Sequence, residues 1–113
     1  MKLELFWKSK ENKVFNLGIL KYENEIYTFK INIYDLKEAI KAGCYGIGNF
    51  DLKNIEYKDK NLFDFFENRL PDDIEMQELI NLYNIEKKDK MEILKITKAK
   101  KYKDNYWLEE KID

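Results

Sequence analysis

One proline, Pro71, separates two segments in the middle of the chain that each have the pattern of a helix. Residues 62–70 before it read LFDFFENRL and place apolar and aromatic side chains at helical spacing, which predicts a short helix over about 61–69. Proline cannot continue that helix, but Asp72 and Glu75 have capping-box spacing and predict a second helix from about 73 to 83. The apolar stripe of this second helix consists of Met76, Leu79, Ile80 and Tyr83. The simplest interpretation is a pair of helices that pack into a core.

The first third of the chain carries the pattern of β-strands. Leu3, Leu5 and Trp7 occupy alternate positions, the period of a half-buried strand. Similar segments at 14–22 and 26–33 are separated from it, and from each other, by a polar turn at 8–13 and a two-residue hairpin turn at 23–24. Connections this short predict a three-stranded antiparallel meander. Gly18, inside the second strand, indicates a bulge or a close backbone approach.

Shorter elements follow the meander. Residues 34–42 predict a helix that ends at Gly43, a residue type common at helix C-termini. We expect a short strand at 55–57, a last helix that starts at Asp89 with Glu92 at capping-box spacing, and a closing strand at 106–108. The side chains expected to face inward are Leu36, Ala39 and Ile40 in the helix at 34–42, and Met91 and Leu94 in the last helix.

These elements predict one α+β domain over residues 1–113. Its antiparallel N-terminal sheet, the three-stranded meander plus short additional strands, is packed with three to four short C-terminal helices.

The charge balance and the absence of long apolar runs limit the partners and the location that we expect for the chain. The charged fraction is 38%, yet the formal net charge is only −1. Balanced charge gives little attraction to phosphate backbones or anionic lipids, so we expect no direct binding of nucleic acid and no membrane partner. The sequence has no apolar run long enough for a membrane span, no leader pattern at its N-terminus and one cysteine, which together predict a cytoplasmic protein.

Lysines gather near the end of the last predicted helix, and two interpretations stay open for them. Cations stabilise a helix C-terminus, while a basic cluster can also bind an acidic or phosphate-bearing partner. The cluster consists of Lys95, Lys98, Lys100, Lys101 and Lys103.

The residue types of most common active sites are missing. The sequence has no histidine, which excludes Ser-His and Cys-His nucleophiles and most zinc sites. Cys44 alone is typical of a small buried hydrophobe, and the glycine cluster in residues 43–48 lacks the Lys-Ser/Thr of a phosphate-binding loop and indicates an irregular loop. We expect no catalytic, cofactor-binding or metal-binding residues. A small carboxylate enzyme is the remaining catalytic hypothesis, with Asp64 and Glu67 as its candidates.

Residues 62–72 have the order L-x-x-F-F-x-N-x-L-P-D. A helix and an apolar–acidic run at 84–94 follow them, and two strand-like segments at 16–20 and 26–30 precede them. This arrangement resembles the N-terminal subdomain of HipA-type serine/threonine kinases, the toxins of bacterial toxin–antitoxin modules. The residues that carry the resemblance are Leu62, Phe65, Phe66, Asn68, Leu70, Pro71 and Asp72.

The sequence also departs from that family. The proline-rich extended segment of the family would fall at 44–50, which contain no proline, and its I-G-x-D-x-x-G-A stretch is replaced after Ile96 by TKAKKYKDN. The catalytic-loop and metal-binding motifs of a kinase are missing, and a HipA-type kinase is several times longer. The resemblance therefore covers the leading subdomain without the catalytic part.

Such a subdomain, standing alone, corresponds to HipS of the three-component HipBST arrangement, in which the kinase HipT lacks it and HipB carries a DNA-binding helix-turn-helix. The resemblance implies an antitoxin without enzymatic activity that binds a HipA- or HipT-like kinase and holds it inactive, with a HipB-like protein as a further partner. The alternative is a general protein-interaction domain of the same fold with no effect on a kinase.

Partner contacts of such a domain would be aromatic anchors and polar residues at the helix junction. Core burial is the alternative for each aromatic, and helix capping is the alternative for the two acids. The candidates are Phe50, Phe63, Phe66, Arg69, Asp72, Asp73 and Trp107, with Trp7 as a further anchor.

Overall fold

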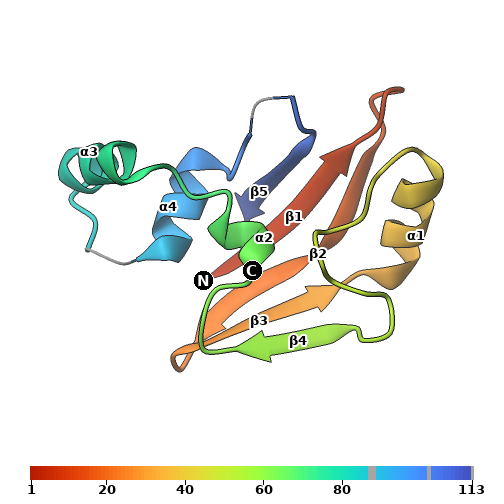
Figure 1. Ribbon diagram of the computed structural model, residues 1–113, viewed down its shortest axis with the longest axis horizontal. Coiled ribbons are helices and arrows are strands. Elements are labelled where there is room, and N and C mark those ends of the chain that lie inside the picture. The colour runs from red at the N-terminus through yellow and green to blue at the C-terminus, as the bar shows by residue number, and fades with distance from the viewer. Residues whose placement is uncertain (87–88, 102, 113) are drawn as a thin grey trace.

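The computed structural model describes residues 1–86, 89–101 and 103–112. Within these ranges five strands form one antiparallel sheet in the order β4-β3-β2-β1-β5 (Figure 1). The strands are β1 (Lys2–Lys8), β2 (Val14–Glu23), β3 (Ile26–Ile31), β4 (Glu56–Asp59) and β5 (Tyr106–Glu110). The helices are α1 (Ile33–Lys41), α2 (Asp64–Glu67), α3 (Asp73–Tyr83) and α4 (Lys90–Thr97). The predicted α+β fold, with its three-stranded meander and additional strands, is confirmed.

The sheet has one apolar face, which the alternation in β1 establishes. Leu3 and Leu5 are fully buried and Trp7 nearly so, as predicted. The core continues on the same face through Leu108 of β5 and Phe29 of β3. The opposite face carries half-buried and exposed side chains such as Phe6, Ile19, Lys30 and Trp107, which lie outside the core cluster.

A bulge in β2 allows both halves of that strand to face the core. Leu5 pairs with Gly18 and Phe6 pairs with Asn16, so Leu17 is an extra residue on the bulged strand. Because of this insertion, Phe15 and Leu17 are buried before the bulge and Leu20 is buried after it, although strict alternation would place them on opposite faces. The expected irregularity at Gly18 is confirmed.

The hairpin turn between β2 and β3 lies one residue later than predicted. Glu23 pairs with Ile26, and the two residues between them, Asn24 and Glu25, have φ of 53° and 64°. A two-residue turn with positive φ at both central positions matches the twist of the flanking strands. Asn24 tolerates that conformation well, and Glu25 adopts it because the register on either side is fixed.

The helices begin at side-chain caps. Asn32 caps α1, so β3 ends at Ile31 rather than at 33 and the helix starts one residue earlier than predicted. Leu36 and Ala39 of α1 are buried, but Ile40 is 40% exposed and does not belong to the predicted inward face. Asp89 caps α4 by accepting a hydrogen bond from the Glu92 amide at 3.0 Å, as its spacing predicted.

The two helices beside Pro71 differ from each other in burial. α2 covers only Asp64–Glu67 and is shorter than the predicted 61–69. Phe63 is its N-cap, with extended backbone and no side-chain capping bond, and Asn68 is its C-cap. α3 has the predicted bounds, and Asp72 accepts from the Glu75 amide at 2.8 Å. None of the residues of α3 is buried, so its apolar stripe is not the core face that the periodicity predicted.

The buried face of α4 is wider than predicted. Met91 and Leu94 are buried as expected, and Ile93 is buried with them. None of the helices in the described ranges is long and apolar enough to cross a membrane.

Replacing Gly18 with alanine is expected to lower the free energy of unfolding by about 1–3 kcal/mol. A Cβ at this position would lie 2.5 Å from the Lys30 carbonyl oxygen and 3.0 Å from the Phe29 ring. Urea denaturation measures the change. The control Lys21→Ala, on the same strand but half-exposed, should stay within about 0.5 kcal/mol of the parent. Equal stability of Gly18→Ala and the parent would contradict the close approach.

Candidate protein-binding site

A groove of about 440 Å³ lies beside the edge strand β4, where the loop before β4 meets the start of α2. Aromatic rings and short polar side chains share its lining. The lining residues are Asn49, Phe50, Tyr57, Asp59, Asn61, Leu62, Phe63, Asp64 and Phe65. We refer to this feature as the aromatic groove.

Phe50 is at the centre of the rings in the aromatic groove. Its ring centroid lies 4.9 Å from that of Tyr57 and 5.3 Å from that of Phe63, both in edge-to-face arrangements. Phe50 also packs at 5.0 Å on Phe29, which is fully buried in the core. The half-buried rings of the groove are therefore held on a rigid floor. Two of the predicted anchors, Phe50 and Phe63, are brought together here.

Carboxylates give the aromatic groove a negative character. Asp59 and Asp64 are exposed in its lining. Next to it, the Tyr57 hydroxyl donates to the Asp51 carboxylate at 2.7 Å, and this hydrogen bond lowers the pKa of Asp51 and raises the pKa of Tyr57. Rings together with carboxylates favour an apolar side chain or a lysine or arginine side chain as the ligand.

The other aromatic candidates lie elsewhere. Phe66 is fully buried and packs edge-on against Phe29 with centroids 5.1 Å apart, so it is a core residue and not a partner anchor. Trp7 is also in the core. Trp107 stacks on Phe6 at 5.6 Å on the opposite face of the sheet, away from the aromatic groove.

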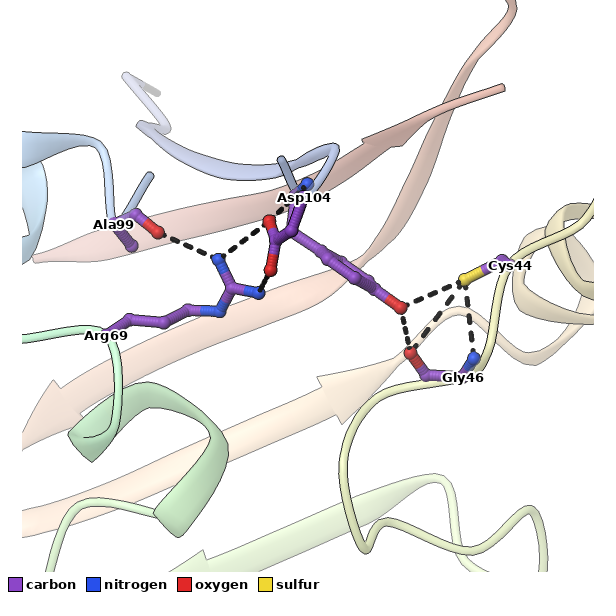
Figure 2. Close-up of polar contacts among 6 residues, drawn as sticks. Cys44, Gly46, Arg69, Ala99 and Asp104 are labelled. Carbon is purple, nitrogen blue, oxygen red and sulfur yellow. Dashed lines mark hydrogen bonds and ion pairs between the residues drawn. The ribbon is translucent and has the colours of Figure 1, made fainter. Parts of the chain in front are cut away.

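Arg69 is not the surface contact that we predicted. It is 7% exposed, and its guanidinium donates to the Ala99 carbonyl at 2.9 Å and forms an ion pair with Asp104 (Figure 2). The rings of Phe65 and Tyr106 contact the guanidinium, with centroids at 4.5 and 4.9 Å. Arg69 therefore ties the end of α2 to the segment between α4 and β5, because burial of its charge requires all of these partners.

Tyr106 extends this network to the loop after α1. Its hydroxyl donates to the Gly46 carbonyl and lies 3.3 Å from the Cys44 sulfur, which also accepts from the Gly46 amide at 3.4 Å (Figure 2). The pKa of Tyr106 is raised above its ordinary value. Burial is the larger cause, and the hydrogen bond with Cys44 is the next. Cys44 is 5% exposed, so the predicted buried cysteine in an irregular loop is confirmed.

The acidic candidates have separate roles. Asp72 is committed to the cap of α3, and Asp73 is exposed in the first turn of the same helix. The two carboxylates of the enzyme hypothesis do not converge, since Asp64 faces the aromatic groove and Glu67 pairs with Lys90 at 2.9 Å.

The lysine cluster is partly explained by local structure. Lys95 pairs with Glu92 at 2.8 Å, and Lys98 is the C-cap of α4 with φ of 59°.

Among the residues that the structure describes, no group of three or more Cys, Asp or Glu could hold a metal ion.

Of the residues that line the aromatic groove, only Phe50 and Phe63 were among the predicted partner contacts. Tyr57 and Asp59 come from a four-residue strand whose pattern is too short to show which side faces the protein. Phe65 was in the motif around Pro71, but the motif does not distinguish its half-buried position from the full burial of Phe66.

No protein-family model matches the chain, and a search of curated proteins finds no match.

Removal of the Arg69 charge should destabilise the fold far more than removal of an exposed one. Arg69→Met is expected to lower the free energy of unfolding by about 3 kcal/mol, since it leaves the Asp104 carboxylate without its ion-pair partner and the Ala99 carbonyl without the guanidinium donor. The matched control Lys90→Met breaks the exposed pair with Glu67 and should cost less than about 1 kcal/mol. Equal losses in thermal unfolding would contradict the structural role of Arg69.

Ionisation of Tyr106 should limit stability at high pH. The raised pKa means that the folded state keeps the hydroxyl protonated after the unfolded chain has begun to lose its proton near pH 10, so stability falls as the pH rises above 10. Tyr106→Phe should cost about 1 kcal/mol at pH 7, and this deficit should shrink between pH 10 and 11. The exposed control Tyr45→Phe should show no such convergence when urea midpoints are measured against pH.

Proposed function

We propose that the chain is a non-catalytic protein-binding domain of a toxin–antitoxin module, which binds a HipA-like serine/threonine kinase and holds it inactive in the manner of a HipS-type antitoxin. The observation that supports protein binding is the aromatic groove, in which the half-buried rings of Phe50 and Phe63 contact each other and Phe50 packs on the buried Phe29. The choice of a kinase as the partner rests on the resemblance of residues 62–72.

The aromatic groove has the properties of a binding anchor. Tilted ring packing at 5.0 Å on the buried Phe29 holds Phe50 in place, so little side-chain freedom is lost when a partner binds. Aromatic residues at the centre of an interface supply much of its affinity, and the surrounding Asn and Asp side chains can form the polar rim. A domain docked in this way inhibits a kinase by filling its cleft or by blocking the movement of the loop over the phosphates.

The proposed assembly contains a third protein. A HipB-like helix-turn-helix protein would bind DNA as a third component, so that this chain needs no nucleic-acid contact of its own, and the complex would act in the cytoplasm.

The second candidate function is a general protein-interaction domain, because an aromatic groove with a carboxylate rim serves partners of many classes.

The proposal predicts a HipA-like kinase encoded beside this gene, and the test uses that kinase. The purified chain is expected to lower its phosphorylation rate, and Phe63→Ala should require at least about 10-fold more protein for the same inhibition, since it removes an aromatic anchor. The matched control Phe6→Ala changes another half-buried aromatic on the opposite face of the sheet and should inhibit like the parent.

Two outcomes would contradict the proposal. A neighbouring gene without any kinase-like product removes the partner. Tight binding with an unchanged phosphorylation rate favours the general interaction domain instead.

A further inference from the structure

Helix α3 exposes apolar side chains along its whole length. Ile74 is 74% exposed, Leu82 is 76% exposed and Tyr83 is 54% exposed. The predicted stripe residues Met76, Leu79 and Ile80 are only half-buried. Figure 1 places α3 at one end of the long axis of the molecule, away from the sheet.

The apolar residues of α3 lie on two sides of the helix. At 100° per residue, Ile74 and Leu82 lie about 80° apart around the helix, and they are about 12 Å apart along its axis. The predicted stripe of Met76, Leu79, Ile80 and Tyr83 occupies the other side, and only Tyr83 of these four is exposed. A helix with apolar residues on both sides is typical of an element that is covered on both sides. Only the side with the half-buried stripe meets the rest of the chain here.

All the charged side chains of residues 70–86, the segment that contains α3, are acidic. No Lys or Arg occurs between Leu70 and Glu86, although the chain contains 21 of them. Glu78 lies between Ile74 and Leu82 on the exposed side, one turn from each. The acids of this segment are Asp72, Asp73, Glu75, Glu78 and Glu86.

We propose that α3 is a docking helix that binds an apolar groove rimmed by lysine and arginine side chains on a protein partner. Ile74 and Leu82 would enter the apolar part, in the helix-in-groove mode, and Glu78 would meet the basic rim. The charge argues against two other occupants. A second copy of α3 would place like charges together, and an anionic lipid surface would repel the helix.

This inference deepens the proposed function and rests on it for the identity of the partner, the HipA-like kinase. It concerns a second contact, since the aromatic groove is formed by residues 49–65 and α3 lies outside that range. Two contacts that engage one partner together raise affinity beyond what either gives alone.

Binding of the kinase to single and double variants tests the inference by calorimetry at low and high salt. Ile74→Ser with Leu82→Ser should weaken binding about 30-fold, the size expected for a pair of anchor residues. Glu78→Lys should weaken binding at low salt and flatten its salt dependence. The controls Val14→Ser with Ile112→Ser, and Glu11→Lys, change exposed residues outside α3 and should bind within two-fold of the parent. Circular dichroism confirms that each variant is folded.

Parent-like binding of both α3 variants would overturn the docking role even where the kinase is inhibited. If the parent chain does not bind the kinase, the proposed function fails. The docking role of α3 is then tested with a photo-crosslinking amino acid incorporated at position 82 in the source cells. A cross-linked protein that has lysine or arginine around an apolar groove, and that binds the parent more tightly than Glu78→Lys once purified, supports it. Cross-links to a second copy or to lipid alone, or none, overturn it.

Discussion

The close packing of Gly18 against Phe29 is the contact on which the rest of the structure depends. Gly18 occupies the bulge of β2, where a side chain would collide with β3, and the bulge returns both halves of β2 to the apolar face. A shift of one residue would move these side chains to the other face. Phe29, seated on Gly18, in turn supports Phe50 in the aromatic groove and Phe66 in the core. The position of Phe50 in the candidate site therefore depends, through Phe29, on the backbone irregularity at Gly18.

A second set of contacts holds the irregular segments in place. Arg69 connects the end of α2 to Asp104, and Tyr106 connects the start of β5 to the loop at Gly46 (Figure 2). Phe65 packs against the Tyr106 ring at 5.4 Å as well as against the guanidinium, so this network also fixes one wall of the aromatic groove. The groove thus depends on residues far apart in sequence, and its shape is set by the folded core rather than by any one loop.

Features with a local cause could be predicted from the sequence, and features with a tertiary cause could not. The alternation in β1 and the caps at Asp72 and Asp89 involve neighbours a few residues apart, and all three were correct. The buried role of Arg69 depends on a partner 35 residues away, which spacing alone does not reveal. The stripe of α3 had helical periodicity, but periodicity shows which residues share a side and not whether that side is covered. For the same reason, the sequence identified Phe50 and Phe63 as aromatic candidates without showing that they meet.

The two outer strands restrict the ways in which another polypeptide can attach to this sheet. β4 has four residues, three of them exposed and charged, with Lys58 and Glu56 paired at 3.5 Å, and β5 ends in Glu109 and Glu110. Short, charged edge strands resist hydrogen bonding to an incoming strand. Main-chain addition to the sheet, with its tolerance of many sequences, is therefore disfavoured. A partner must instead be recognised through side-chain contacts, which makes binding selective. The charged edge strands also oppose the addition of further copies of this chain to the sheet, and therefore oppose fibril growth.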